Sequence, residues 1–568
     1  MDRITKSLLD EFASEHDLTS LAEDKQFEHF ASYLMVRRHY AETFEPGEIV
    51  TGAGGDTGID AIAIVVNNVL VTDAATVDEL LKINGYLEVV FVFIQADRSP
   101  HFDSSKIGNF GFGIRDFFSS TPQLPRNRAV QNSAAIMSEI YRRSSKFMRG
   151  NPACRGYYVT TGKWVGDPTL VARFQAEIRD LLATGLFKDV DIQPIGAVGI
   201  QRSYNQSRNA ISREFLFANR TVVPEIAGVK EAHLGFIPAD EFLKIICDEE
   251  GWLIRSLFYE NVRDWQNYNE VNSEIRDTLL SSDRDRFVLM NNGITIIART
   301  LQTTANRFVI GDFQVVNGCQ TSHVLYDNKN LLEGVRVPIR LISTQDEGVI
   351  GAIIRATNRQ TEVRREQFFA LTDLAKKIEH YFASFPAGQQ LYYERRSRQY
   401  DSLPIEKTRV VTQTSLIKAY GAMFLGEAHR TTRDFSALAE KVGKEMFLEE
   451  DKLDPYYTSA FALYKIEYQI RNQRLDAKYN RARFAMIYAA RILANPHPLP
   501  PRNSRNMEKY CATISRLLWD ARSADELFEN AASVIDAVSG SDLNTDTIRT
   551  QPFTEAVERK CREIARVS

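Results

Sequence analysis

Three oxygen-bearing side chains near the N-terminus are placed where they would bind a divalent cation. Asp60 opens an apolar run directly after a glycine-rich stretch, and Gln95 ends the next long apolar run. A carboxylate that begins a buried strand is costly to bury unless a cation compensates its charge. Glu28, on the polar side of the preceding helix, would approach the same point. Because Mg²⁺ and Mn²⁺ prefer such oxygen ligands, the spacing predicts a metal site made by Asp60, Gln95 and Glu28, suited to phosphodiester hydrolysis.

The residues around this set follow a recognisable order. A helix carries Glu28, Gly-Gly-Asp-Thr-Gly-Ile-Asp60 leads into a strand, and Phe93-Ile-Gln-Ala-Asp97 ends its neighbour. This order resembles the PD-(D/E)xK nuclease superfamily, in which a lysine stands two residues after the Glu or Gln. The resemblance implies a restriction-endonuclease-like α/β module in which that lysine positions the attacking water. Here the position is Asp97.

The aspartate at the lysine position leaves three interpretations open: catalysis is lost, a nearby cation replaces the lysine, or the site holds more metal. Aspartate adds an anion beside Asp60 and needs either a second metal or a raised pKa. Arg98 is adjacent but would point to the opposite face of a continuing strand, whereas Lys106 on the following helix could reach back. The predicted catalytic set is therefore Asp60, Gln95, Asp97, Lys106 and Glu28.

Alternating strands and helices are predicted to position these side chains. Residues 1–46 have helical periodicity, 59–66 and 86–94 read as buried strands, and 73–83 suits a turn or short helix between them. The following segments are predicted as helix 105–118, helix 129–147, strand 156–161, helix 168–186 and strand 190–195. Pro194 confines the last strand to a sheet edge. This alternation predicts an α/β module with a partly parallel sheet, ending near residue 205.

The remainder of the chain divides into two further parts. Two strand-like runs between 215 and 245 precede a helix, and a second α/β region follows to about residue 430. Residues 431–568 have helical periodicity, interrupted by a proline-rich linker at 495–501. The predicted class is α/β multidomain, with domains at 1–205, 206–430 and 431–568 and the last one all helical.

The most distinctive central stretch is Phe313-Gln-Val-Val-Asn-Gly-Cys-Gln-Thr-Ser322, an apolar strand that runs into a polar turn. Gly318 permits a positive φ or the close approach of a ligand, and Thr321 or Ser322 would cap a helix. The N-terminus of that helix would suit a phosphate or another anion. A purely structural strand–turn–helix is the alternative.

Three more clusters are rich in amide, hydroxyl or guanidinium groups: residues 291–295, 357–361 and 392–396. Amides hydrogen-bond well but transfer protons poorly, so this composition favours recognition over chemistry. The predicted ligand-binding set is Asn291, Asn292, Asn317, Gln320, Thr321, Asn358, Gln360 and Arg395.

The order of these motifs is similar to that of a known family. Leu257-Phe-Tyr-Glu-Asn-Val-Arg-Asp264, Val271-Asn272 with Thr278-Leu279, Asn-Asn-Gly-Ile-Thr, Val-Val-Asn-Gly-Cys-Gln-Thr-Ser, Ala-Thr-Asn-Arg-Gln-Thr and Tyr-Tyr-Glu-Arg-Arg follow one another between residues 250 and 430. By this series the chain is identified as a member of the abortive-infection phage-resistance (AIPR) family. The resemblance implies a central AIPR domain behind a nuclease-like N-terminus, and a role in anti-phage defence. A looser similarity to ParB-like proteins implies a nucleotide or nucleic-acid pocket lined by the central amides.

Composition limits the remaining choices. The formal net charge is −4, so any nucleic-acid binding must be local rather than spread over a basic surface. No run of about 18 uncharged apolar residues occurs and the first residues are acidic and amphipathic, which predicts a cytoplasmic protein without a membrane segment. The arginine clusters read as solvated helix faces. The tyrosines and arginines between 456 and 474 read as a helix-packing seam or as a surface for single-stranded nucleic acid, with dimerisation also plausible there.

Two functional hypotheses follow. The first is a Mg²⁺- or Mn²⁺-dependent nuclease, acting on DNA rather than RNA, whose central domain senses a phage-derived trigger. The second is a catalytically inactive recognition protein that keeps a nuclease fold for binding nucleic acid or a nucleotide and regulates a partner.

Overall fold

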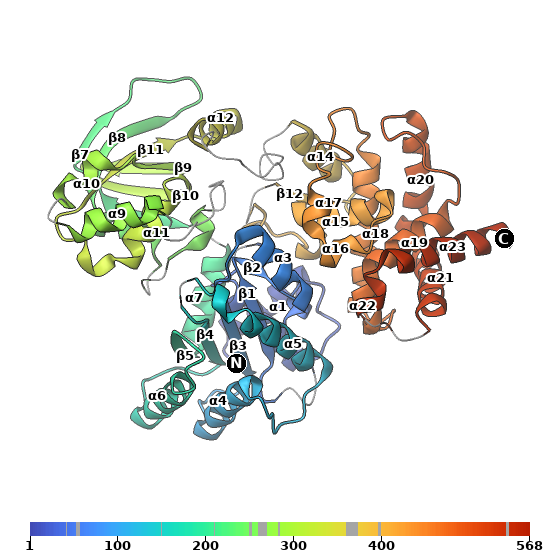
Figure 1. Ribbon diagram of the computed structural model, residues 1–568, viewed down its shortest axis with the longest axis horizontal. Helices are drawn as coiled ribbons and strands as arrows, with labels where there is room; N and C mark the ends of the chain where they lie inside the picture. The colour runs from blue at the N-terminus through green and yellow to red at the C-terminus, as the bar shows by residue number, and fades with distance from the viewer. Residues whose placement is uncertain are drawn as a thin grey trace. The chain divides into compact units, whose positions relative to one another are not determined.

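The structure is a computed structural model of the chain. It describes residues 1–40, 42–52, 57–148, 150–208, 211–248, 251, 253–258, 270–281, 284–358, 373–395, 399–540, 543 and 545–567. The chain forms two compact units (Figure 1). Unit 1 consists of Met1–Ser207 and Thr372–Ser568, and unit 2 of Arg208–Leu371. The predicted mixed α/β class with a helical C-terminal region is confirmed.

Unit 1 contains a five-stranded sheet in the order β2-β1-β3-β4-β5. Its strands are β1 (Ala61–Val66), β2 (Val69–Leu70), β3 (Val89–Asp97), β4 (Ala153–Thr160) and β5 (Asp189–Ile195). β1 runs antiparallel to β2 and β3, whereas β3, β4 and β5 are parallel. The partly parallel sheet is therefore as predicted, and β5 with its Pro194 lies at the edge.

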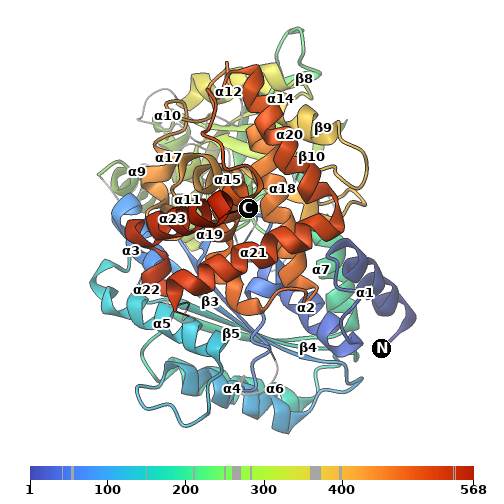
Figure 2. The same cartoon turned by 90° about the vertical axis from the view of Figure 1, so that its right-hand side faces the viewer.

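Helices cover both faces of this sheet (Figure 2). One face packs against α1 (Arg3–Glu15), α2 (Glu23–Val36) and α7 (Ala197–Arg208), and the other against α3 (Ala74–Asn84), α4 (Ser104–Phe118), α5 (Arg128–Arg142) and α6 (Pro168–Leu182). Phe91 and Phe93 of β3 point toward the α4 side, and Val92 and Ile94 point toward the α2 side. Burial on both faces explains why the strand is a continuous apolar run.

The short strand β2 was not predicted. Asn67 and Asn68 separate it from β1, both with positive φ (49° and 64°), and Val66 pairs with Val69 across them. Two consecutive residues with positive φ make the turn type that best matches the twist of a hairpin. The Asn-Asn pair was the local signal, but a two-residue strand has no periodicity to read.

Unit 2 contains a six-stranded sheet in the order β6-β10-β9-β11-β8-β7. Its strands are β6 (Ser212–Leu216), β7 (Asn219–Val222), β8 (Glu231–Pro238), β9 (Ile294–Thr304), β10 (Arg307–Asn317) and β11 (Arg336–Ser343). All neighbours are antiparallel except β9 and β11. Three strands precede the first helix instead of the expected two, because the short, polar β7 gave no apolar signal.

Helices again lie on both faces of the unit 2 sheet. α8 (Ala239–Ile246), α9 (Glu270–Leu280), α10 (Phe287–Met290) and α11 (Cys319–Asp327) share the larger core, and α12 (Glu347–Asn358) packs on the other face. β10 ends at Asn317 and α11 begins at Cys319, so the polar turn predicted at Asn317-Gly318 joins this strand to this helix.

The second segment of unit 1 is mostly helical. Its helices are α14 (Asp373–Ala383), α15 (Gln413–Leu425), α16 (Arg430–Arg433), α17 (Phe435–Ala439), α18 (Asp454–Arg471), α19 (Arg483–Ala494), α20 (Arg505–Trp519), α21 (Ala521–Ser539), α22 (Thr545–Ile548) and α23 (Gln551–Val567), with a parallel strand pair β12 (Tyr392–Glu394) and β13 (Val410–Thr412). The predicted linker at 495–501 separates α19 from α20. Among the helices described, none is long and apolar enough to cross a membrane.

Short 3-10 helices complete the list of elements. They are η1 (Pro46–Glu48), η2 (Ser144–Lys146), η3 (Arg255–Phe258), η4 (Arg284–Arg286), η5 (Lys329–Leu331), η6 (Lys407–Arg409) and η7 (Ala477–Ala482).

Buried charged contacts join the two segments of unit 1. Arg37, just after α2, pairs with Asp401, and Thr43 Oγ1 donates to Glu394 Oε2 at 3.0 Å. The helical segment is therefore part of the same compact unit as the N-terminal sheet. The predicted domain limits near 205 and 430 remain predictions, while the compact units meet at 207/208 and 371/372.

Removal of Arg37 should destabilise unit 1. Its side chain is only 4 % exposed, so Arg37→Ala takes away the guanidinium that compensates the carboxylate of Asp401. We expect the free energy of unfolding in urea to fall by about 3 kcal/mol. Arg142→Ala, at a pair whose arginine is 71 % exposed, is the control and should change it by less than about 1 kcal/mol. Equal stability of the two variants would contradict the buried pair.

Glu394 should make stability depend on pH. Burial raises the pKa of Glu394 from 4.5 to about 8, with the charge of Asp401 adding to the effect. The folded state then holds a proton that the unfolded state has lost, so the free energy of unfolding should fall as pH rises from about 5 to 8. Glu394→Gln should flatten this fall by about 2–4 kcal/mol in urea titrations at successive pH values. Glu79 and Glu467, whose pKa values burial raises to about 7, contribute to the slope that remains. If the free energy of unfolding depends on pH in the same way in Glu394→Gln and in the unchanged protein, the raised pKa of Glu394 is refuted.

Candidate active site

The ends of β1 and β3 bring Asp60 and Gln95 together. The register pairs Ala61 with Ile94, so Asp60 stands opposite Gln95 and both side chains point to the α4 side of the sheet. Gln95 Nε2 and the backbone N–H of Ala96 each donate to Asp60 Oδ2 at 2.7 Å. Asp60 is 9 % exposed, so its carboxylate is held by these donors at a buried position.

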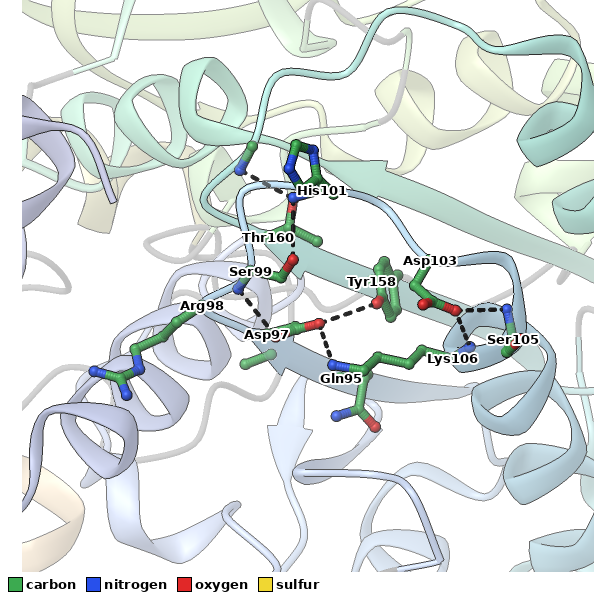
Figure 3. Close-up of polar contacts among 12 residues, drawn as sticks. Gln95, Asp97, Arg98, Ser99, His101, Asp103, Ser105, Lys106, Tyr158 and Thr160 are labelled. Atoms are coloured by element: carbon green, nitrogen blue, oxygen red, sulfur yellow. Dashed lines mark hydrogen bonds and ion pairs between the residues drawn. The ribbon is translucent and has the colours of Figure 1, made fainter.

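Asp97 lies two residues after Gln95 in β3, and its side chain is on the same face of the strand. Figure 3 shows its carboxylate between Lys106 and Tyr158. Lys106 Nζ lies 2.7 Å from Asp97 Oδ2, and the Tyr158 hydroxyl donates to the same oxygen at 3.4 Å. Asp97, where the resemblance expects a lysine, is thus ion-paired with a lysine from another element.

Lys106 lies in the first turn of helix α4. Asp103 is the N-cap and accepts hydrogen bonds from the backbone N–H groups of Ser105 and Lys106, which fixes the first turn beside the strand tip. The hydrogen bond to Asp97 raises the pKa of Lys106, and the charges of Asp97, Asp103 and Asp60 contribute in the same direction. Lys106 therefore carries a positive charge within electrostatic range of Asp60.

Arg98 points away from this group, as the alternation of a strand requires. Figure 3 shows the Arg98 side chain directed away from Asp97 and Lys106. Its guanidinium pairs with Glu23 of α2 at 2.9 Å, on the opposite face of the sheet. Arg98 therefore does not extend to the face of β3 that carries Gln95 and Asp97.

Glu28 lies on α2 and is paired within its own helix. Lys25 Nζ lies 2.7 Å from Glu28 Oε2. Burial lowers the pKa of Lys25, but Glu28 outweighs this effect and the charge of Asp60 adds to the net rise. In the described residues no group of three His, Cys, Asp or Glu side chains is close enough to hold a metal ion. Glu28 is thus paired with Lys25 on α2, which covers the face of the sheet opposite to the one toward which Asp60 points.

Acidic and basic groups alternate around the strand tips. Asp60 acts electrostatically on Lys106 of α4 and on Lys25 of α2, which cover opposite faces of the sheet. Such a set can bind a cation through carboxylate and amide oxygens and stabilise negative charge through its ammonium groups. Sequence reasoning missed Lys25, although its position one helical turn before Glu28 is the usual spacing of a helical ion pair.

The central candidates form a second polar cluster, in unit 2. Asn291 Nδ2 donates to Thr321 Oγ1 at 3.1 Å, and Asn317 Nδ2 donates to the Thr357 carbonyl at 3.0 Å. Gln320 Oε1 accepts a hydrogen bond from Asn272 Nδ2 at 2.6 Å. These bonds tie the start of α11 to the segments before β9 and at the end of α12. The amides therefore bond to other protein groups within this cluster.

A comparison with protein families matched residues 258–566 to the model described as AIPR protein. The chain belongs to the AIPR family. Membership suggests a part in abortive-infection defence against phage. No curated protein and no solved structure matched the chain. The AIPR match extends past the six motifs and through the C-terminal helices, whereas the Asp60 site lies outside it.

The other predicted ligand residues of the AIPR region are dispersed. Asn292 is exposed beside Asn291, and Asn358 is the last residue of α12, with its side chain outside the described set. Gln360 lies outside the described residues altogether. Arg395 belongs to unit 1, where its buried guanidinium pairs with Glu379. The polar cluster of unit 2, hereafter the AIPR cluster, contains four of the predicted ligand residues: Asn291, Asn317, Gln320 and Thr321.

Tyrosines of the C-terminal AIPR helices pack inside unit 1. Tyr456, Tyr457 and Tyr464 of α18 are buried, and Tyr457 stacks on Phe385 with ring centroids 3.8 Å apart. Their burial agrees with the interpretation as a packing seam. Tyr468, near the end of the same helix, and Arg474, three residues after the helix ends, are more accessible.

Gly318 of the AIPR motif should not tolerate a side chain. Its φ is +95°, and a Cβ built there would lie 2.7 Å from Cγ1 of Ile294. Gly318→Ala should therefore destabilise unit 2 by about 2 kcal/mol, through both backbone strain and the clash. Faster hydrogen exchange in β9, β10 and α11 would report it. Gly388→Ala, where the structure leaves open space, is the control; matching exchange rates in both variants would count against the packing role.

Proposed function

We propose that this AIPR protein is a Mg²⁺- or Mn²⁺-dependent nuclease that acts on DNA during phage defence. The observation that carries the proposal is the contact between Asp60 and Gln95 at the tips of β1 and β3, with the ammonium of Lys106 bound to Asp97, two residues after Gln95. The hydrolytic site would lie in the N-terminal part of unit 1, and the AIPR region would control it.

The fold around this contact supports the assignment. An antiparallel β1–β3 pair is extended by the parallel strands β4 and β5, and α2 and α4 flank the sheet on opposite faces. Asp60 and Gln95, the metal-binding residues that the PD-(D/E)xK resemblance implies, contact each other at adjoining strand ends, and this contact supports the proposal. The mixed sheet is the arrangement that the restriction-endonuclease-like prediction requires.

Asp60 and Gln95 supply some of the oxygen ligands that a hard divalent cation needs. Asp60 supplies a buried carboxylate and Gln95 an amide at hydrogen-bonding distance, and carboxylate and amide oxygens are suitable ligands. Gln95 directs its amide nitrogen to Asp60, so a cation there requires the amide oxygen to take that place. Bound at Asp60 and Gln95, the ion would polarise a phosphodiester and lower the pKa of water. Glu28 would assist by movement away from Lys25.

Lys106 would perform the task of the missing lysine. Its ammonium stays protonated because Asp97 accepts its hydrogen bond, and α4 holds it at the strand tip. An ammonium at this place stabilises negative charge that develops on a phosphate. Asp97 would then position Lys106 rather than contact the substrate. This choice selects the second of the three interpretations of Asp97, replacement by a nearby cation.

The AIPR cluster would provide recognition. Its amides and hydroxyls around Asn317 and Thr321 suit hydrogen bonding to a phage-derived trigger or to a nucleotide. A homodimer is the oligomeric state that we propose for testing alongside this role.

Asp97 also supports a second candidate, a recognition protein without hydrolytic activity. An anion at the lysine position weakens the standard site if Lys106 cannot reach the substrate while paired with Asp97. Such a protein would bind nucleic acid and leave the chemistry to a partner.

Cleavage assays separate the two candidates. Purified protein with plasmid, single-stranded DNA and RNA, with and without Mg²⁺ or Mn²⁺, should cut DNA only when metal is present. Asp60→Ala should lower the rate at least about 100-fold, because it removes the charged ligand, whereas Asp10→Ala, at an exposed ion pair on α1, should not. Metal-independent rates, or equal rates for both variants, would reject the nuclease.

The role of Lys106 has its own test. Lys106→Met should lower the cleavage rate by about 10- to 100-fold. The exchanged variant Asp97→Lys with Lys106→Asp keeps the ion pair and moves the ammonium to the strand, so it should recover activity relative to Lys106→Met. If the exchanged variant is no more active than Lys106→Met, Lys106 has no part in the proposed mechanism.

A further inference from the structure

One face of the unit 2 sheet is open along β7, β8 and β11. Helix α12 packs over β9 and β10 through Ile297 and Val316, and the four helices of the larger core cover the opposite face. The alternation of β11 directs Val337, Ile339 and Leu341 into that larger core, so the residues between them point to the open face. The strand register places the following side chains on the open face: Asn219, Thr221, Leu234, Phe236, Arg336 and Arg340.

The open face combines exposed arginines with apolar groups. Arg336 and Arg340 are exposed, and Leu234 is 48 % exposed. The guanidinium carbon of Arg336 lies 5.9 Å from the ring centroid of Phe236, over the ring. The side chains that β7, β8 and β11 direct to this face include no acidic residue, and among the described residues neither arginine has an ion pair. The face is therefore locally positive although the whole chain carries a net charge of −4.

The open face continues into the AIPR cluster. Arg340 of β11 pairs in register with Thr295 of β9, and Thr295 pairs with Asn317 of β10, so the three residues form a row across adjacent strands. The side chain of Thr295 is fully buried, and its Oγ1 has no hydrogen-bond partner within the described part of the chain. Apolar packing alone does not call for a buried hydroxyl at this place. A polar row thus leads from the exposed Arg340 to the family motif at Asn317.

The chemistry of the open face fits a single strand of nucleic acid. Arginines without a counter-ion bind phosphates, and an aromatic ring stacks on a base. The faces of the bases are accessible in a single strand and are hidden in a duplex. An apolar protein partner would bury Arg336 and Arg340 without compensating their charge, which is costly.

We infer that the open face of the unit 2 sheet binds single-stranded DNA, with phosphates at Arg336 and Arg340 and a base on Phe236. The face offers no carboxylate to accept a hydrogen bond from a 2′-hydroxyl, so DNA rather than RNA is the expected strand. Single-stranded DNA would then be the ligand that the AIPR region recognises. The open face lies in unit 2 and Asp60 in unit 1, so binding here needs neither a metal ion nor hydrolysis.

Binding measurements with the full chain test the open face. Fluorescence anisotropy with a labelled oligothymidylate of about 15 nucleotides, in EDTA and at about 100 mM salt, should show about five- to tenfold weaker binding for Arg336→Gln and for Arg340→Gln. Each of these variants should also reduce the slope of log K against log salt by about 0.7, because each arginine neutralises about one phosphate. Phe236→Leu should weaken binding about tenfold and leave the slope unchanged, because it removes the stacking ring but no charge. The control Arg307→Gln, at an exposed arginine of β10 that pairs with Glu214, should bind like the unchanged protein.

The outcomes separate this inference from the nuclease proposal. Asp60→Ala should bind the oligonucleotide normally, so loss of cleavage in that variant rejects nothing about the open face. Unchanged affinity in both arginine variants, tighter binding of duplex DNA or of RNA of the same sequence, or no binding by the unchanged protein would overturn the inference. Arg336 and Arg340 are exposed, so their variants keep the test decisive if thermal unfolding shows that Phe236→Leu is misfolded.

Discussion

The antiparallel register between β1 and β3 is the constraint on which the candidate site depends. With Ala61 opposite Ile94, Asp60 and Gln95 meet on one face of the sheet. A slip of one residue would turn Asp60 toward α2, because side chains alternate along a strand. Apolar residues on both faces hold the register, since Ile62 and Ile64 enter one core and Ala61 and Ala63 the other. Core packing thus determines where the polar tip residues point.

The positive charge at the strand tip comes from a helix. Asp97 occupies the strand position and Lys106 reaches it from α4, so an ammonium is present although the local sequence pattern lacks one. The Asp103 N-cap and the buried aromatic residues of α4 fix the direction of that helix. A charge supplied from a second element can be placed near a substrate without interrupting the apolar strand, and its removal need not disturb the sheet.

The AIPR region spans parts of both compact units. Its first part contributes β9, β10 and β11, three of the six strands in the sheet of unit 2. Its second part packs in unit 1 through contacts such as Arg37 with Asp401 and Arg549 with Asp73. This arrangement gives a physical basis for communication between family region and N-terminal module.

The amino-acid pattern alone was sufficient for the strands β1 and β3, the helices around them, the edge position of β5 and the place of Asp60 and Gln95 at strand ends, because burial on two faces leaves a local apolar run. The same pattern marked the turn at Gly318 and the family motifs. Only the tertiary structure decided which groups meet: Lys106 with Asp97, Glu28 with Lys25 rather than Asp60, Arg395 with Glu379, and Arg481 with Asn132. Periodicity records how deeply each residue is buried, whereas the partner of a long polar side chain is set by the packing of whole elements, which no local window contains.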